Sequence, residues 1–168
     1  MTKRNSQFAR LLWVLGCAWL VVAADQFVKN FLIAALEPGK SVDFLGSLVR
    51  LTLVFNDSAA FSIGFGATWI FTILSSVAAL ALIWYSFKIQ TSGWAAMAGV
   101  LLGGITGNLI DRLVREPGFG IGHVVDYIQV PFNFPIFNIA DMAIFIICTL
   151  SVIRIMRGDQ IGRQRVSA

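Results

Sequence analysis

The stretch WAAMAGVLLGGITGNLIDR, residues 94–112, decides the fold of this chain. Its apolar part, residues 94–110, can cross a membrane if it borrows a flanking residue or two, because a spanning helix needs roughly 20 apolar residues. Gly99, Gly103 and Gly107 recur at intervals of four, a spacing that lets two helix backbones approach closely in lipid. We therefore expect a membrane helix whose glycine stripe packs against a neighbouring helix.

Apolar segments also dominate the rest of the chain, which is 57% hydrophobic and only 13% charged. A soluble domain carries about 25% charged residues, so this composition indicates an integral membrane protein. We predict one membrane domain over residues 1–168, all-α with a small β part. Its four spanning helices are expected at about 11–29, 67–87, 94–110 and 136–155.

The charged residues divide between the two ends of these predicted helices. Eight of the thirteen basic residues lie on the side of the two termini, and only one acid, Asp159, accompanies them. The other eight of the nine acids lie on the opposite side. Since Lys and Arg concentrate in cytoplasmic segments, both termini are expected in the cytoplasm and the two longer loops outside. The basic residues follow apolar runs rather than aromatic-rich basic stripes, so no nucleic-acid partner is expected.

The first outer loop contains a pattern typical of β-strands. Leu51, Leu53 and Phe55 alternate with polar residues up to Asn56, which is the period of a strand with one apolar face. A partner strand is expected at Val42–Leu45, after the Pro38-Gly39 turn. We predict a small extracytoplasmic sheet at about residues 38–60, resting on the membrane and directing Asn56 toward the outer carboxylates.

Polar side chains cluster where the third helix leaves the membrane and the fourth re-enters it. Asn108, Asp111 and Arg112 stand at i, i+3 and i+4, so they share one helix face. Asn138 and Asp141 repeat the three-residue spacing at the start of the fourth helix.

Between these two sets runs a short apolar strand or turn, Gly122–Tyr127, which carries Asp126. Three aspartates are therefore expected to meet in one pocket. From the helices alone, Asp111 and Asp141 are the favoured pair.

Each of these residues also has a purely structural interpretation. Asn138 is a residue type that commonly caps helices, and Asp111 with Arg112 is a plausible interfacial ion pair. Solvated loop charges account for Asp43, Asp57 and Glu116. Asp141 is harder to explain in this way, because a charged carboxylate inside an apolar helix costs on the order of ~3 kcal/mol.

The absence of other reactive sets narrows the chemistry. The single histidine, His123, excludes a two-histidine metal motif, and neither cysteine has a histidine placed to activate it. We expect no metal and no cofactor. Two close carboxylates in a partly dry site share a proton, so that one can accept a proton from water while the other donates.

Five motifs recur in an order that resembles a known family. They are Asp25-Gln26-x-x-Lys29, Asn56-x-x-Ala59-Ala60-Phe61-Ser62, Gly107-Asn108-Leu109-Ile110-Asp111-Arg112, Gly122-His123-Val124-Val125-Asp126 and Phe137-Asn138-Ile139-Ala140-Asp141. Together they resemble the lipoprotein signal peptidase family, also called signal peptidase II, from the first helix through the fourth.

The resemblance implies an aspartyl endopeptidase of the bacterial inner membrane that cleaves diacylglyceryl-modified prolipoproteins before the lipidated cysteine. By position, Asp126 and Asp141 match its catalytic dyad, so the choice of Asp126 over Asp111 comes from the family. The polar residues lining its pocket correspond to Asn56, Asn108, Arg112 and Asn138. Its supporting motif acids correspond to Asp25 and Asp111.

The family also implies an outer β-cradle and a mobile amphipathic helix over the site, which we place between Phe61 and Trp69. Two departures from the family pattern stand out. Val28 replaces a small hydroxyl residue, which should affect packing only. Asp57-Ser58 replaces Thr-Gly, which adds a carboxylate beside the pocket and removes a glycine.

Two functions from other classes remain open at this point. A small proton-coupled transporter also carries aspartates in its helices, although such sites lie near mid-bilayer and these acids gather at one boundary. A non-enzymatic membrane scaffold explains the glycine stripe but leaves the paired Asn-x-x-Asp sets without a role. The expected partners are the prolipoprotein and membrane lipid, and the expected assembly is a monomer.

Overall fold

A computed structural model describes residues 3–57 and 68–163 of the chain. The described part contains four helices long and apolar enough to cross a membrane. They are α1 (Lys3–Ala35), α2 (Thr68–Ser86), α3 (Ser92–Val114) and α4 (Ile139–Met156). The predicted class, a helical membrane protein with a small sheet, is confirmed.

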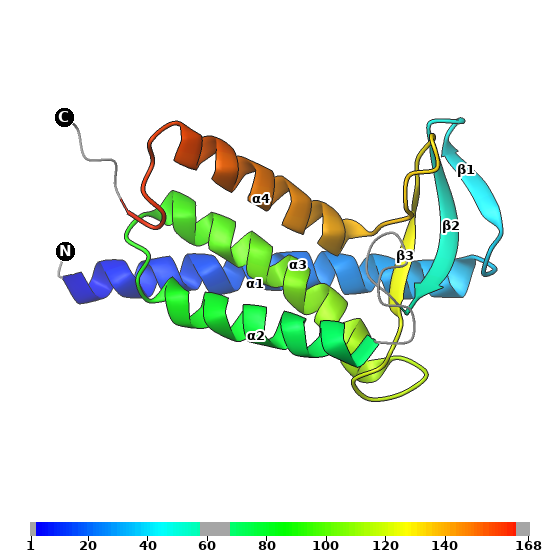
Figure 1. Cartoon of the computed structure of the whole chain (residues 1–168), viewed down its shortest axis with the longest axis horizontal. Helices are drawn as coiled ribbons and strands as arrows, with labels where there is room; N and C mark the ends of the chain where they lie inside the picture. The colour runs from blue at the N-terminus through cyan, green and yellow to red at the C-terminus, as the bar shows by residue number, and fades with distance from the viewer. Residues whose placement is uncertain (1–2, 58–67, 164–168) are drawn as a thin grey trace.

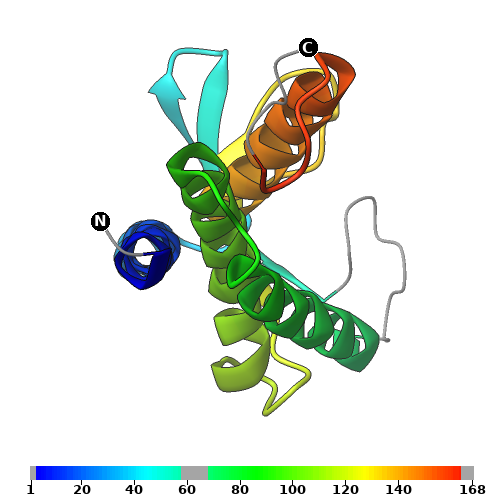
Figure 2. The same cartoon turned by 90° about the vertical axis from the view of Figure 1, so that its left-hand side faces the viewer.

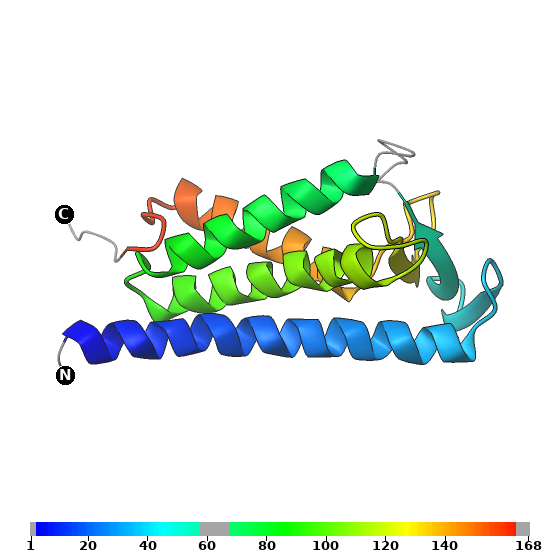
Figure 3. The same cartoon turned by 90° about the horizontal axis from the view of Figure 1, so that it is seen from below.

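Helix α3 is the centre of the bundle, and the other three helices pack around it (Figure 2). Helix α1 runs straight along the whole bundle and continues to the level of the sheet (Figure 3). Helices α2 and α4 both lie against α3 but diverge from each other when the bundle is viewed from its end.

The glycine stripe of α3 contacts two neighbours. A Cβ at Gly103 would lie 2.7 Å from Val21 Cβ in α1, and one at Gly104 would lie 2.7 Å from the Ala140 carbonyl in α4. Both distances are too short for a real side chain, so glycine is what allows these helices to approach. The predicted packing role is confirmed, and the close approach extends to two faces of α3.

A three-stranded antiparallel sheet in the order β1-β2-β3 covers one end of the bundle (Figure 1). The strands are β1 (Ser41–Leu45), β2 (Val49–Asn56) and β3 (Val124–Gln129). The last residues of β2 pair with the first of β3, since Asn56 lies opposite Val124 and Val54 opposite Asp126. This register brings Asn56 beside Asp126.

The apolar side of the sheet packs on the end of α1. Leu53, Val125 and Tyr127 form a buried cluster with Leu32 of α1. Val28, the residue that departs from the family pattern, packs against the same cluster. The sheet is therefore fixed to the helix that also carries Asp25.

Some local expectations differ from the structure. Helix α1 begins earlier and ends later than the predicted 11–29. The strict alternation expected in β2 breaks because the register shifts between Leu51 and Val54, so the adjacent Thr52 and Leu53 are both buried. Phe55, expected on the apolar face, is 43% exposed.

The amphipathic helix predicted between Phe61 and Trp69 lies almost entirely outside the described residues. Its last two positions, Thr68 and Trp69, begin α2. The hydroxyl of Thr68 donates to the Asp57 carbonyl at 2.5 Å, which holds the end of β2 against the start of α2.

Candidate active site

A buried ion cluster joins α1 to α3 at the end of the bundle that faces the sheet. The Lys29 ammonium lies 2.7 Å from Oδ2 of Asp25 and 2.7 Å from Oδ2 of Asp111, and all three side chains are fully buried. Lys29 donates a further hydrogen bond to Oδ1 of Asn108 at 3.0 Å. Its three protons thus have three acceptors, as a buried ammonium requires.

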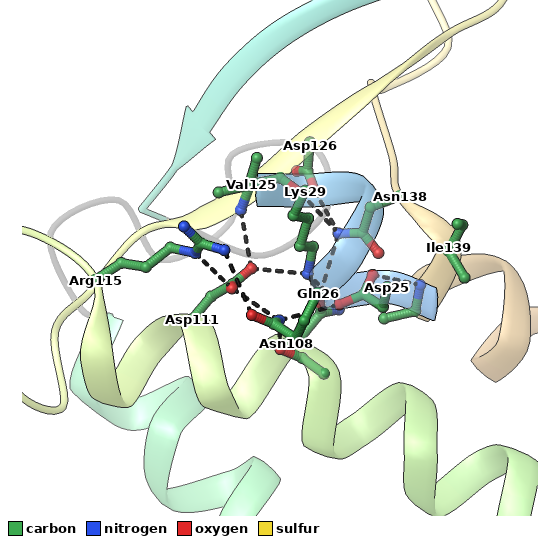
Figure 4. Close-up of polar contacts among 12 residues, drawn as sticks. Asp25, Gln26, Lys29, Asn108, Asp111, Arg115, Val125, Asp126, Asn138 and Ile139 are labelled. Carbon is green, nitrogen blue, oxygen red and sulfur yellow. Dashed lines mark hydrogen bonds and ion pairs between the residues drawn. The ribbon is translucent and has the colours of Figure 1, made fainter. Parts of the chain in front are cut away.

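Asp111 is held by this cluster rather than by the aspartates it was expected to join (Figure 4). Its Oδ1 accepts from Arg115 Nε at 2.6 Å and from Gln26 at 3.0 Å. Its Oδ2 accepts the backbone N–H of Val125 at 3.1 Å. Asp111 thus neutralises two cations, Lys29 and Arg115, and these contacts do not favour the pairing with Asp141 expected from the helices alone.

The first turn of α4 contains a capping box built from Asn138 and Asp141. Asn138 Oδ1 accepts the Asp141 N–H at 2.9 Å, and Asp141 Oδ2 accepts the Asn138 N–H at 3.1 Å. Asp141 Oδ1 also accepts from Asn108 Nδ2 at 2.7 Å. Both oxygens of this half-buried carboxylate are thus oriented by donors from the site.

Asp126 lies on β3 and is 3% exposed. Its Oδ1 accepts from Asn138 Nδ2 at 2.6 Å, and its Oδ2 accepts from Asn56 Nδ2 at 2.8 Å. Asn138 therefore contacts both Asp126 and Asp141, one through its side-chain amide and the other through its backbone. Asn138 caps α4, as its residue type predicts, and it also contacts the two aspartates.

The environment of Asp126 favours its protonated form. Burial raises the pKa of its carboxyl from 3.8 to about 7, and the nearby charge of Asp141 adds to the rise. The hydrogen bonds from Asn56 and Asn138 and the charge of Lys29 oppose the shift without cancelling it. A carboxyl on β3 that favours its neutral form therefore shares the site with a half-buried, hydrogen-bonded carboxylate on α4.

Arg112 occupies the same face of α3 one turn beyond Asn108. Its guanidinium lies 5.8 Å from the centre of the Phe71 ring in α2 and interacts electrostatically with Asp126 and Asp141. The contact connects α2 to the site.

The structure thus brings most of the predicted residues to one place. Asn56, Asn108, Asn138, Asp126 and Asp141 form a continuous hydrogen-bonded set, while Asp25 and Asp111 lie behind it. In the described part of the chain, no group of three or more His, Cys, Asp or Glu residues is arranged to hold a metal ion.

Sequence reasoning gave no role to three residues of this site: Gln26, Lys29 and Arg115. A signal was present for two of them. Lys29 follows Asp25, and Arg115 follows Asp111, by four residues, which is the spacing of an ion pair along a helix.

Paired carboxylates, held by amides at one end of a membrane helix bundle, define the class of membrane-embedded aspartic peptidases. A family profile described as "Signal peptidase (SPase) II" matches residues 17–157. The chain belongs to the lipoprotein signal peptidase (signal peptidase II) family, an aspartic peptidase family.

Individual relatives agree with this assignment. A lipoprotein signal peptidase of Leifsonia xyli subsp. xyli is 45% identical over 164 residues, which cover 98% of this chain and 76% of the relative. One from Mycobacterium leprae is 36% identical over 159 residues, covering 93% and 79%.

The fold also matches solved structures. A bacterial membrane enzyme determined by the in meso method at 2.3 Å resolution has a TM-score of 0.78 and 26% identity, covering 92% of this chain and 94% of its own. These comparisons give no support to the transporter alternative, and the family is one of enzymes rather than scaffolds.

Proposed function

We propose that this chain removes signal peptides from diacylglyceryl-modified bacterial prolipoproteins by cleaving before the lipidated cysteine, with Asp126 and Asp141 as the catalytic dyad. The observation that carries the proposal is the contact of one residue, Asn138, with both carboxylates. Fifteen positions separate the two aspartates in the sequence, yet they share this partner. Membership of the signal peptidase II family supplies the reaction class.

In this mechanism Asp141 is the base and Asp126 the acid. Asp141 takes a proton from water as the water oxygen bonds to the scissile carbonyl carbon, and Asp126 gives its proton to the carbonyl oxygen. When the C–N bond breaks, the leaving nitrogen takes the proton from Asp141. The proton of the former carbonyl oxygen returns to Asp126, so the dyad is restored without a covalent intermediate.

The amide residues around the dyad have a second task. An extended peptide near lipid needs its backbone N–H and C=O groups satisfied, since water is scarce there. Asn56, Asn108 and Asn138 would hold the substrate backbone, and Arg112 would orient a carbonyl.

The substrate's apolar signal helix would lie among the four helices of the bundle, with its scissile bond at the dyad. Its acyl chains would remain in the bilayer.

The same proposal includes an orientation in the inner membrane. Both termini lie in the cytoplasm, and the sheet and dyad lie near the outer surface, as the distribution of Lys and Arg favours. The protein acts as a monomer surrounded by membrane lipid.

The test is incubation of the purified protein with a diacylglyceryl-modified prolipoprotein and with its unlipidated form. Mass analysis of the products should find a new N-terminus at the lipidated cysteine for the first substrate and no cleavage of the second. Equal cleavage of both forms would contradict the proposed substrate class, and no cleavage of either would contradict the activity.

A further inference from the structure

Lys29 is a buried titratable group to which the proposed reaction assigns no step. It lies on α1 with no exposed side-chain surface, although burying an ammonium costs several kcal/mol before its partners compensate. We propose that Lys29 is a positioning residue, which sets the orientation of the amides that hold Asp126 and Asp141 and fixes the backbone before each of them. This inference rests on the proposed peptidase function.

The first step of the argument concerns the direction of hydrogen bonds. An ammonium only donates, so the Asn108 atom 3.0 Å from Lys29 Nζ must be the amide oxygen. The Asn108 amide nitrogen is then left to face Asp141, to which it donates at 2.7 Å. A side-chain amide alone has no such preference, because its two ends are nearly the same shape.

The orientation of the Asn108 amide also favours one orientation of the Asn138 amide, which contacts the second aspartate, Asp126. Asn108 Oδ1 accepts from Asn138 Nδ2 at 3.1 Å, so the amide nitrogen of Asn138 points toward Asn108. That nitrogen donates to Asp126 at 2.6 Å. Lys29 therefore orients Asn108 directly and reinforces the orientation that the helix cap gives Asn138, and each amide donates to a different carboxylate of the dyad.

The second step concerns the backbone. Asp25, paired with Lys29, accepts the N–H of Ala140 at 3.1 Å, and Ala140 immediately precedes Asp141. Asp111, also paired with Lys29, accepts the N–H of Val125 at 3.1 Å. Val125 immediately precedes Asp126. Through two carboxylates the ammonium thus locates β3 and the start of α4 relative to α1 (Figure 4).

A merely structural lysine would neutralise Asp25 and Asp111 and have no other effect. Charge neutralisation and amide positioning can be separated by experiment, because removing a carboxylate together with Lys29 also keeps the buried charges balanced. Replacing Lys29 by Met and Asp25 by Asn together removes one positive and one negative charge, so the buried site keeps its charge balance. The double variant lacks the donor that orients Asn108 and that pairs with Asp111, while the amide oxygen at position 25 can still accept the Ala140 N–H.

The experiment measures kcat, KM and thermal unfolding of the purified protein with the lipidated prolipoprotein. Lys29→Met should lower kcat by about 100-fold and change KM by less than about 3-fold, since misplaced catalytic groups affect the chemical step. Asp25→Asn with Lys29→Met should recover the unfolding temperature without recovering kcat. Lys29→Gln, whose amide can still donate to Asn108, should fall between Lys29→Met and wild type.

The pH dependence of cleavage is a further measurement, because a lysine that only stabilised the fold would not change it. Asp126 is faced by the charges of Lys29 from α1, Arg112 from α3 and Asp141 from α4. Because the Lys29 charge lowers the pKa of Asp126, Lys29→Met should shift the loss of activity on the alkaline side to higher pH.

The matched control is Lys40→Met, which removes a lysine whose side chain is 71% exposed and paired with Glu37. It should leave kcat, KM and pH profile unchanged. The inference is overturned if the double variant has a kcat within about 3-fold of wild type, or if all three Lys29 variants fail to fold. Failure of wild type itself to cleave the prolipoprotein would instead contradict the proposed function.

Discussion

At the scale of single residues, the site depends on donors and acceptors that point in defined directions. Asp126 and Asp141 each accept two hydrogen bonds through their side-chain oxygens from nearby amides. Asp25 and Asp111 each form an ion pair with buried Lys29, and Asp111 also pairs with Arg115. Arg112 interacts electrostatically with both Asp126 and Asp141. This contrast distinguishes the aspartates suited to proton transfer from those that hold the framework.

Substitution of either dyad member tests that distinction. Asp126→Asn and Asp141→Asn should each lower cleavage by about 1,000-fold or more, because an amide neither takes nor gives the required proton. Both variants should accumulate in the membrane, since the shape of the side chain is kept. Quantitative immunoblotting and mass analysis of products check both points.

The matched control is Asp43→Asn on the outer strand, where the side chain is 64% exposed and pairs with Arg50. Full activity of this control and substantial turnover by Asp126→Asn would remove Asp126 from the dyad.

The pKa of Asp126 leads to a prediction about pH. Because burial and the Asp141 charge raise this pKa to about 7, the shared proton is present below pH 7 and lost above it. Cleavage should therefore decline as the pH rises through about 7. In a rate profile, kcat/KM should fall tenfold per pH unit on the alkaline side.

The stability of the fold should change in the same direction. A carboxyl whose pKa is raised on folding binds a proton that the unfolded chain has already lost, so its contribution is complete below pH 3.8 and disappears as pH approaches 7. Thermal unfolding of Asp126→Asn should lack this component. An unchanged pH dependence in that variant would assign the component to another group.

Site residues could be predicted where they belong to a sequence motif. They were harder to predict where their role depends on which side chains lie opposite them in space. Asn56, Asn108, Asn138 and Asp126 came from patterns that the structure places in one hydrogen-bonded set. Helix spacing alone chose Asp111 for the dyad, because it gives no information on which cations lie opposite. Lys29 was overlooked for the same reason, since a lysine in an apolar helix is identified only by the partners that surround it.

At the scale of elements, the position of the site follows from how closely α3 approaches its neighbours. Gly103 and Gly104 lie on adjacent faces of α3, one against α1 and the other against α4. Asn108 follows them by about one turn, and it joins Lys29 of α1 to Asp141 of α4. The hydrogen bonds of Asn108 therefore depend on helix contacts below it.

Filling one of these contacts should disturb the whole bundle. The added methyl group of Gly103→Ala would lie 2.7 Å from Val21 Cβ and 2.8 Å from the Ala18 carbonyl, so α1 has to move. Overpacking of this kind costs about 1–3 kcal/mol, which thermal unfolding of the purified protein would detect.

Gly16→Ala is the control, because Gly16 is also in a membrane helix but has nothing within 4 Å of an added Cβ. If the two substitutions changed the unfolding temperature equally, helix propensity would explain the effect, and the contact of Gly103 with α1 would not.

Elements were predictable where hydrophobic periodicity is strong. The four spanning segments and the two hairpin strands follow from run length and alternation, whereas β3 was expected only as a strand or turn. This strand, Val124–Gln129, is short and its first four residues are all buried, so it lacks the alternation that identifies a half-exposed strand. The shift in β2 after Leu51 was likewise not predictable, since a bulge depends on the partner strand.

At the scale of the whole molecule, the distribution of charge predicts how the chain lies in the membrane. Lys40 precedes β1 at the sheet end, and Lys88 lies in the link between α2 and α3 at the opposite end. With Cys17 and Cys148 replaced by alanine, Lys40→Cys should react with an impermeant thiol reagent in intact spheroplasts. Lys88→Cys should react only after the membrane is opened.

The reverse labelling pattern would place the dyad at the cytoplasmic surface and contradict the proposed orientation. Both lysines are exposed, so accessibility of the side chain within the protein does not explain a difference between them.

The length of α1 has a consequence for the lipids around the enzyme. Its 33 residues span about 50 Å, whereas the hydrocarbon core of a typical bilayer is about 30 Å thick. Because Asp25 and Lys29 belong to this rigid rod, a change in acyl-chain length alters its tilt and, with it, the depth of the reacting groups. We therefore expect turnover in reconstituted bilayers to depend on the acyl-chain length of the lipid.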